Sequence, residues 1–172
     1  AGWGLRASEV AALHVSQFGR DVPADDVPYI AFESRKNGPG EVSVLFGLEV
    51  LDVRIDELDD DETWDGYLFP SSQGESPHVT RDTIRNWFQT LAAEADLPDR
   101  IDGDRPSPQL CRRFWYDTYT TVLGGVLEGV EEIAAEQGST DPRVVMQNYL
   151  SESRSRQVRR EFMREQLEEI FG

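Results

Sequence analysis

The most constraining feature of the sequence is the turn segment Arg35-Lys36-Asn37-Gly38-Pro39-Gly40. Asn-Gly and Pro-Gly pairs favour the backbone angles of tight turns, and the flanking stretches 28–34 and 41–46 are rich in residues that favour strands. We therefore expect a β-hairpin that carries Lys36 in or beside its turn. A third extended segment over 50–55 would complete a small antiparallel sheet.

Two short motifs predict the first helices. Ser8 is placed to cap a short helix that turns Val10 and Leu13 inward, and Thr80 is placed to cap a longer one. In the longer helix, apolar residues recur at the spacing expected of a stripe that faces the core. These residues are Ile84, Trp87, Phe88 and Leu91.

The last part of the chain contains three further helical segments. Ser107-Pro108 is a cap followed by proline at the first helical position, and it opens a long helix in which Gly124-Gly125 can introduce a break or a bend. Asp141-Pro142 repeats the signal and opens a short helix that ends near Tyr149. A final helix is expected over 156–171. The expected fold class is α+β, mainly α-helical, with a small three-stranded antiparallel sheet on one side.

The length of 172 residues suits one well-buried domain, so we treat residues 1–172 as a single unit. No apolar run approaches the roughly 20 residues that span a bilayer, which predicts a cytoplasmic protein without a membrane partner. The single cysteine, Cys111, excludes an internal disulfide and a thiolate zinc cluster.

Acidic residues dominate the charge: 33 Asp and Glu against 17 Lys and Arg give a formal net charge of -16. The run from Asp56 to Glu62 is expected to be a solvated surface. Lys36 is the only lysine, a composition typical of halophiles. In molar salt the Debye length is roughly 3 Å, so net repulsion from a polyanion hardly acts beyond contact range. Local arginines can then still bind phosphate.

Three basic residues and one tyrosine have the chemistry of phosphoryl transfer, and the basic residues are Arg6, Arg112 and Lys36. Arginine offers a rigid fork that matches two phosphate oxygens, which makes Arg6 and Arg112 candidates to hold a phosphate. Gln109 lies one helical turn before Arg112 and could share that phosphate. The ammonium of Lys36 suits protonation of a leaving 5′ oxygen. Taken alone, Arg6 is more often a surface or capping residue and Lys36 a solubilising turn residue.

A tyrosine is the candidate nucleophile. Tyrosine can attack phosphorus directly, and the resulting phosphotyrosine keeps the ester energy, so rejoining requires no cofactor. Tyr149 follows a short capped helix near the end of the chain. Tyr116 and Tyr119 compete with it, but both fall within the long helix and are more easily explained as core residues.

These residues occur in the order found in tyrosine recombinases. Gly4-Leu5-Arg6-Ala7-Ser8-Glu9-Val10, a hairpin lysine, Tyr67-Leu68-Phe69-Pro70 and a late arginine followed by a tyrosine together resemble a phage-integrase catalytic domain over nearly the whole chain. The resemblance implies a C-terminal catalytic domain over residues 1–172 without its N-terminal core-binding domain. It also implies DNA integration or recombination through a 3′-phosphotyrosine, no cofactor or metal, and a tetramer on double-stranded DNA.

By that resemblance the catalytic residues are Arg6, Lys36, Arg112 and the nucleophile Tyr149. Two positions depart from the family pattern, because Gln109 and Ser139 stand where histidines are usual. Both side chains can donate hydrogen bonds to a phosphate, but neither stores a proton near neutral pH. A catalytically degenerate relative that binds DNA without cutting it therefore stays open, as does a helical interaction module with no nucleic-acid role.

Overall fold

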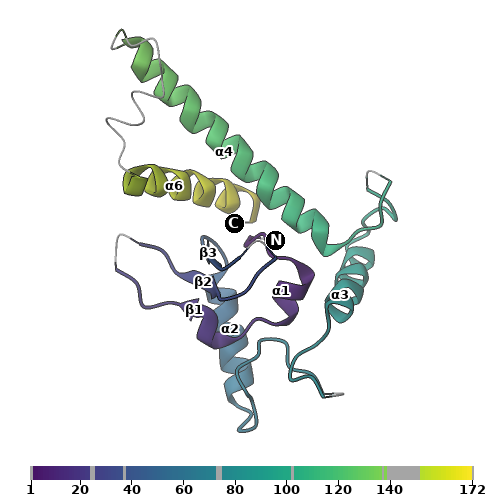
Figure 1. Ribbon diagram of the computed structural model, residues 1–172. Helices are drawn as coiled ribbons and strands as arrows, with labels where there is room; N and C mark the ends of the chain where they lie inside the picture. The colour runs from purple at the N-terminus through teal and green to yellow at the C-terminus, as the bar shows by residue number, and fades with distance from the viewer. Residues whose placement is uncertain are drawn as a thin grey trace. The chain divides into compact units, whose positions relative to one another are not determined.

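The chain divides into two compact units, Ala1–Trp115 and Tyr116–Gly172, which we treat separately (Figure 1). The structure is a computed structural model. It describes residues 2–23, 26–36, 38–72, 75–101, 103–136, 138 and 152–171.

Helices and a small sheet make up the described parts of the chain. In chain order the elements are α1 (Ala7–Ala11), the 3-10 helix η1 (Val15–Gln17), β1 (Phe18–Gly19), β2 (Tyr29–Phe32), β3 (Gly40–Ser43), α2 (Leu48–Asp59), α3 (Arg81–Glu94), α4 (Pro108–Glu136) and α6 (Glu152–Phe171). The expected class, mostly helical with a three-stranded antiparallel sheet, is confirmed.

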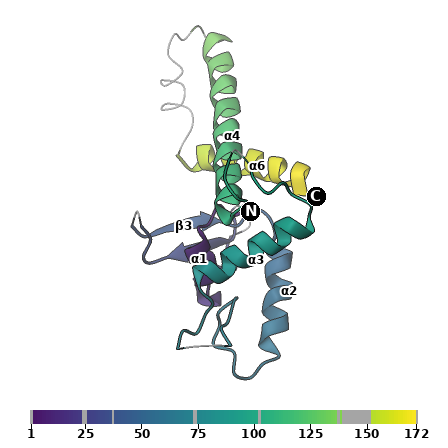
Figure 2. The ribbon, with the colours of Figure 1, turned by 90° about the vertical axis from the view of Figure 1, so that its right-hand side faces the viewer.

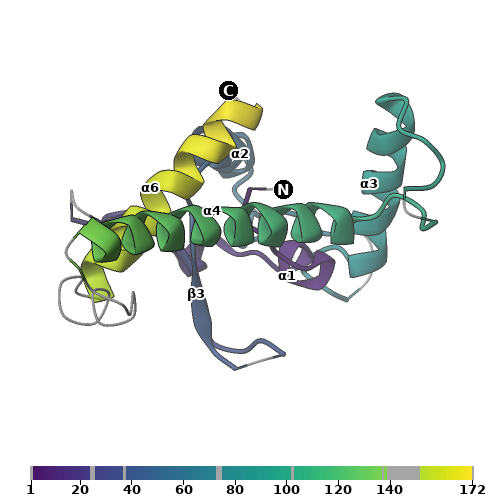
Figure 3. The same ribbon diagram turned by 90° about the horizontal axis from the view of Figure 1, so that it is seen from above.

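The predicted hairpin is present. Strands β2 and β3 pair antiparallel, with Phe32 opposite Gly40. The Gly38 amide donates to the Arg35 carbonyl at 3.0 Å, and Gly38 has a φ of +92°, a conformation that favours glycine. Lys36 lies in the turn between the strands, as predicted. Figures 2 and 3 show this hairpin projecting from the rest of unit 1.

The third strand was placed wrongly by the sequence. Residues 50–55 lie inside α2, and the third strand is instead β1, which pairs with β2 on the side opposite β3. The apolar residues Leu48, Leu51 and Ile55 recur at helical spacing, and all three contact the core. Burial of these three residues on one helix face stabilises the helix more than the valines favour a strand. Val50 and Val53 are exposed.

The first helix begins earlier than expected. Its N-cap is Arg6, so Ser8 lies within α1 and does not cap it. The Glu9 carboxylate instead accepts the Arg6 backbone N–H at 2.7 Å and satisfies one of the amides at the helix start. Leu13 is buried as predicted, and Val10 packs against the core.

The prediction for α3 is correct in its start and wrong in part of its core stripe. Thr80 is the N-cap and accepts the Thr83 amide at 3.2 Å. Ile84 is buried, but Trp87 and Leu91 are 46% and 62% exposed. The second buried residue of this helix is Ala92. The buried face therefore includes a small residue in place of the predicted Trp87 and Leu91.

The long helix α4 starts at Pro108, as predicted, and runs without interruption through Gly124-Gly125. The last helix, α6, is confirmed and extends a few residues further toward the N-terminus than expected. Its most buried side chains are Met163 and Leu167. None of the helices among the described residues is long and apolar enough to cross a membrane.

The core of unit 1 lies between the sheet, α2 and the segments that flank α1. Its buried side chains are Leu5, Leu13, Ile30, Phe32, Val44, Leu51 and Leu68. Leu68 belongs to the Tyr-Leu-Phe-Pro segment, and its amide donates to the Leu13 carbonyl at 2.9 Å. The segment thus anchors the chain between α2 and α3. The acidic run that begins in α2 is exposed at Asp56 and Glu62, as predicted.

Candidate functional site

One carboxylate organises the site. Arg6 and Glu9 lie one turn apart at the start of α1, and the Arg6 Nη1 donates to Glu9 Oε1 at 2.8 Å. Together with the bond from the Arg6 backbone, this fixes the Glu9 side chain against the helix start. Glu9 is the least exposed member of the group, with a side chain 10% exposed.

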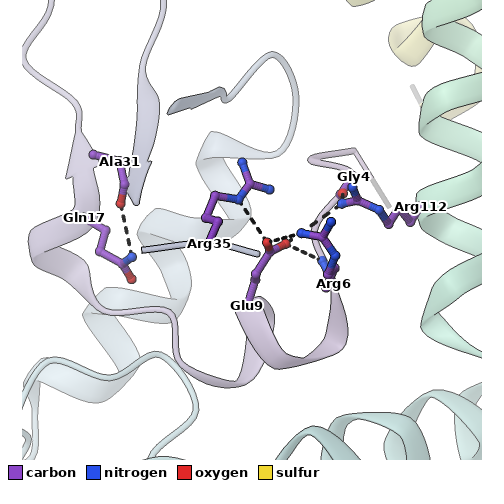
Figure 4. Close-up of polar contacts among 7 residues, drawn as sticks. All are labelled: Gly4, Arg6, Glu9, Gln17, Ala31, Arg35 and Arg112. Carbon is purple, nitrogen blue, oxygen red and sulfur yellow. Dashed lines mark hydrogen bonds and ion pairs between the residues drawn. The ribbon is translucent and has the colours of Figure 1, made fainter. Parts of the chain in front are cut away.

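Arg112 reaches the same carboxylate from the first turns of α4. Its Nη1 donates to the Gly4 carbonyl at 2.5 Å and lies 4.0 Å from Glu9 Oε2. Its side chain is 12% exposed. Two arginines more than a hundred residues apart, both proposed from the sequence, therefore meet at one acidic residue (Figure 4).

A third arginine joins them from the hairpin. The Arg35 Nε donates to Glu9 Oε1 at 3.0 Å, and its guanidinium carbon lies 4.6 Å from the centre of the Phe32 ring. A guanidinium over an aromatic face is held by both dispersion and the ring quadrupole. In Figure 4 the Glu9 carboxylate lies between Arg35 and Arg6.

The charge state of Glu9 follows from these contacts. Burial raises the pKa of Glu9, but the hydrogen bonds from Arg35 and the Arg6 backbone, with the charge of Arg35, outweigh it and hold the pKa below its ordinary value of 4.5. Glu9 is therefore ionised at neutral pH. It offsets part of the repulsion among the arginines.

Lys36 shares a cavity with Arg6, Glu9 and Arg35. The cavity has a volume of about 350 Å³ and is lined by α1, η1, β2 and the hairpin turn, among them Arg6, Glu9, Gln17, Phe32, Arg35 and Lys36. Lys36 is exposed and forms no hydrogen bond or ion pair within the described parts of the chain. The Gln17 side chain donates to the Ala31 carbonyl at 3.1 Å and ties η1 to β2 at the wall of this cavity.

Of the remaining predicted site residues, the structure describes only Gln109. Gln109 is exposed in the first turn of α4, three residues before Arg112, as the sequence implies. Ser139 and Tyr149 lie outside the described residues. The competitors of Tyr149 are both in α4, where Tyr116 is 46% exposed and Tyr119 is half-buried.

Sequence reasoning missed Glu9 and Arg35 as members of the site. A signal for Glu9 was present, because an acid three residues after Arg6 on a helix shares its face. Arg35 stands beside Lys36, but only the fold shows that its side chain turns toward α1 and not toward solvent.

His14 makes structural contacts outside the arginine cluster. Its ring lies 4.9 Å from the Tyr67 ring, and its Nε2 is 2.7 Å from the Asp65 carbonyl oxygen. It links the loop before α3 to the segment after α1. In the described residues no three His, Cys, Asp or Glu side chains gather in a way that could hold a metal ion.

The site combines several positively charged hydrogen-bond donors, a set that is chemically suited to an anion. Arg6, Arg35 and Arg112 gather around one carboxylate and Lys36 lines the adjoining cavity, so the local charge is positive in a strongly acidic chain. No protein-family model, curated protein or solved structure matches this chain. The function is therefore inferred from this geometry and from the sequence motifs.

Proposed function

We propose that unit 1 binds the phosphate backbone of double-stranded DNA at this arginine cluster. In particular, we propose that the chain is a DNA strand transferase of the tyrosine-recombinase type, which cleaves and rejoins DNA through a 3′-phosphotyrosine.

The convergence of Arg6 and Arg112 on Glu9 is the observation that carries this proposal. Arg6 bonds the Glu9 carboxylate at 2.8 Å and Arg112 lies 4.0 Å from it, and the sequence motifs select the same two arginines as phosphate ligands. A rigid pair of guanidiniums is suited to the two nonbridging oxygens of a phosphodiester. Lys36 lines the adjoining cavity, within the same small region of unit 1.

The proposed reaction assigns one role to each residue. Arg6 and Arg112 stabilise the negative charge that builds on the nonbridging oxygens. The Tyr149 hydroxyl gives its proton to solvent as its oxygen attacks phosphorus, the bond to the 5′ oxygen breaks, and the Lys36 ammonium gives that oxygen a proton. Rejoining reverses the step: a 5′ hydroxyl attacks phosphorus, returns its proton to Lys36 and releases Tyr149. Gln109 and Ser139 would donate hydrogen bonds to the phosphate.

Covalent trapping tests the proposal. Because the target sequence is not specified, the substrate is a pool of duplexes with a nick and randomised flanking sequence. Cleavage beside the nick releases a short fragment and leaves the DNA joined to the protein. We expect wild type to form an adduct that survives denaturing electrophoresis, and Tyr149→Phe to form none because it lacks the attacking oxygen. Tyr116→Phe and Tyr119→Phe are the matched controls and should retain the adduct.

The same experiment also tests the alternative that the protein binds DNA without cutting it. Gln109 and Ser139 stand where proton-storing histidines are usual, which favours a relative that binds DNA without cutting it. Duplex binding without adduct in any variant would establish that alternative and overturn the strand-transfer mechanism. Absence of duplex binding at every salt concentration would remove both and leave a protein interaction module.

A further inference from the structure

We propose that Arg35 is a third phosphate-binding residue of the site and contacts the backbone of the bound DNA. This inference rests on the proposed DNA-binding function. It assigns a role to a residue that the sequence motifs did not select.

Most of the hydrogen-bond donors of the Arg35 guanidinium have no partner among the described residues. A guanidinium carries five N–H donors, and within the described residues only the Nε–H of Arg35 forms a hydrogen bond, to Glu9. The N–H groups on the two terminal nitrogens have no acceptor there. A phosphate takes two parallel N–H bonds from such a pair of nitrogens.

Arg35 is also held in place before any ligand arrives. Glu9 fixes its Nε, the Phe32 ring lies against its guanidinium, and its side chain is only 17% exposed. A binding group that is already ordered loses less side-chain entropy when it binds, which raises affinity. The exposed arginines of α3 have no comparable support, because Arg81 is 68% exposed and pairs with its neighbour Asp82.

The position of Arg35 suits the same ligand as Arg6. The Nη1 of Arg6 and the Nε of Arg35 donate to the same oxygen of Glu9, and both residues line one cavity with Lys36. This cavity contains more positive charge than Glu9 neutralises. Arg6, Arg35 and Lys36 against Glu9 leave a net charge of +2, which two successive phosphates of a strand would balance.

Salt-dependent DNA binding tests the assignment. Equilibrium binding of a fluorescent duplex is measured by anisotropy over a series of KCl concentrations. Each lost phosphate contact reduces the slope of log K against log [KCl] by about 0.9 in magnitude. We expect this reduction in Arg35→Gln and in Arg35→Met, with affinity about eightfold lower at 0.1 M KCl if the variants and wild type agree at 1 M.

Two control variants distinguish a direct contact between Arg35 and phosphate from a purely structural role of Arg35. Arg35→Lys keeps the charge but loses the Nε–H that bonds Glu9, so its slope should match wild type. Arg54→Gln removes an arginine that also pairs with a carboxylate, Glu57, and donates to a backbone carbonyl, and its slope should not change. Gln and Met pack differently on Phe32. If one of the two neutral variants does not fold, the slope is measured with the other.

The outcomes distinguish this inference from the proposed function. If wild type binds DNA and Arg6→Gln lowers the slope while both neutral Arg35 variants leave it unchanged, Arg35 has only a structural role and the phosphate contact is refuted. An equal reduction in Arg35→Lys and the neutral variants refutes the phosphate contact too. If wild type binds no duplex at any KCl concentration, the proposed function itself fails, and the role of Arg35 fails with it.

Discussion

Replacing Glu9 by glutamine is the perturbation that tests the structure most directly. The side chain keeps its shape, but one carboxylate oxygen becomes an NH₂ group and the charge disappears. The two oxygens now accept from the Arg6 backbone at 2.7 Å, Arg6 Nη1 at 2.8 Å and Arg35 Nε at 3.0 Å. All three partners are donors, so whichever oxygen is replaced, an NH₂ group faces an N–H.

The expected loss of stability follows from these contacts. A hydrogen bond to a charged group contributes about 1.5–3 kcal/mol, and removing one member of a buried ion pair costs about 3–5 kcal/mol. Arg6 is 29% exposed, so water screens part of the interaction. We expect Glu9→Gln to lower the free energy of unfolding by about 3 kcal/mol, which is roughly 6–12 °C in Tm for a chain of this size.

Tryptophan fluorescence is the right measurement, because all four tryptophans, at positions 3, 64, 87 and 115, lie in unit 1. Thermal unfolding is followed at one fixed, high KCl concentration for all variants. The matched control is Glu57→Gln, which breaks another Arg–Glu pair three residues apart, on the exposed surface of α2. That control should lose less than about 1 kcal/mol. Equal, small losses in both variants would refute the central role of Glu9.

The difference between wild type and Glu9→Gln should depend on pH. Because the pKa of Glu9 is lowered in the folded state, its contribution is fully present above the ordinary value of 4.5 and is lost as pH falls through the folded-state pKa. The gap in stability should therefore be constant near neutral pH and shrink below about pH 4.5. A gap that widens on acidification would contradict the direction of the shift.

Two glycine substitutions should act in opposite directions. Gly4→Ala should destabilise unit 1 by at least about 2 kcal/mol, since φ is +59° and the new Cβ would lie 2.7 Å from the Trp115 ring; tryptophan fluorescence measures the loss, and an unchanged Tm would contradict it. Gly125→Ala should stabilise α4 by about 0.5–1 kcal/mol, because its Cβ meets only open space. Circular dichroism would show this gain, and a loss of helix would argue against a continuous α4.

Local chemistry was enough to predict several elements from the sequence. The Lys36 hairpin follows from residues that prefer turns, and the starts of α3 and α4 follow from a threonine cap and a proline that tolerates the first helical turn. These features depend on neighbours a few residues away. The assignment of Arg6 and Arg112 as phosphate ligands follows from motif order and stays a prediction, whereas their common position at Glu9 comes from the structure.

Other features depended on contacts between distant residues. Residues 50–55 contain valines that suit a strand, yet Leu51 and Ile55, four residues apart, both pack into the core as parts of a helix. The two residues of β1 are too few to leave a periodic pattern, and they become a strand because β2 offers an open edge for hydrogen bonds.

The sequence by itself determined which residues could hold a phosphate, because charge and hydrogen-bonding geometry belong to the side chain. The tertiary structure decided which of the 16 arginines lie together around one carboxylate. Glu9 is nearly buried and must be paired, and the fold brings Arg6, Arg35 and Arg112 within its reach. That selection depends on the desolvation of one carboxylate, a quantity that no local pattern encodes.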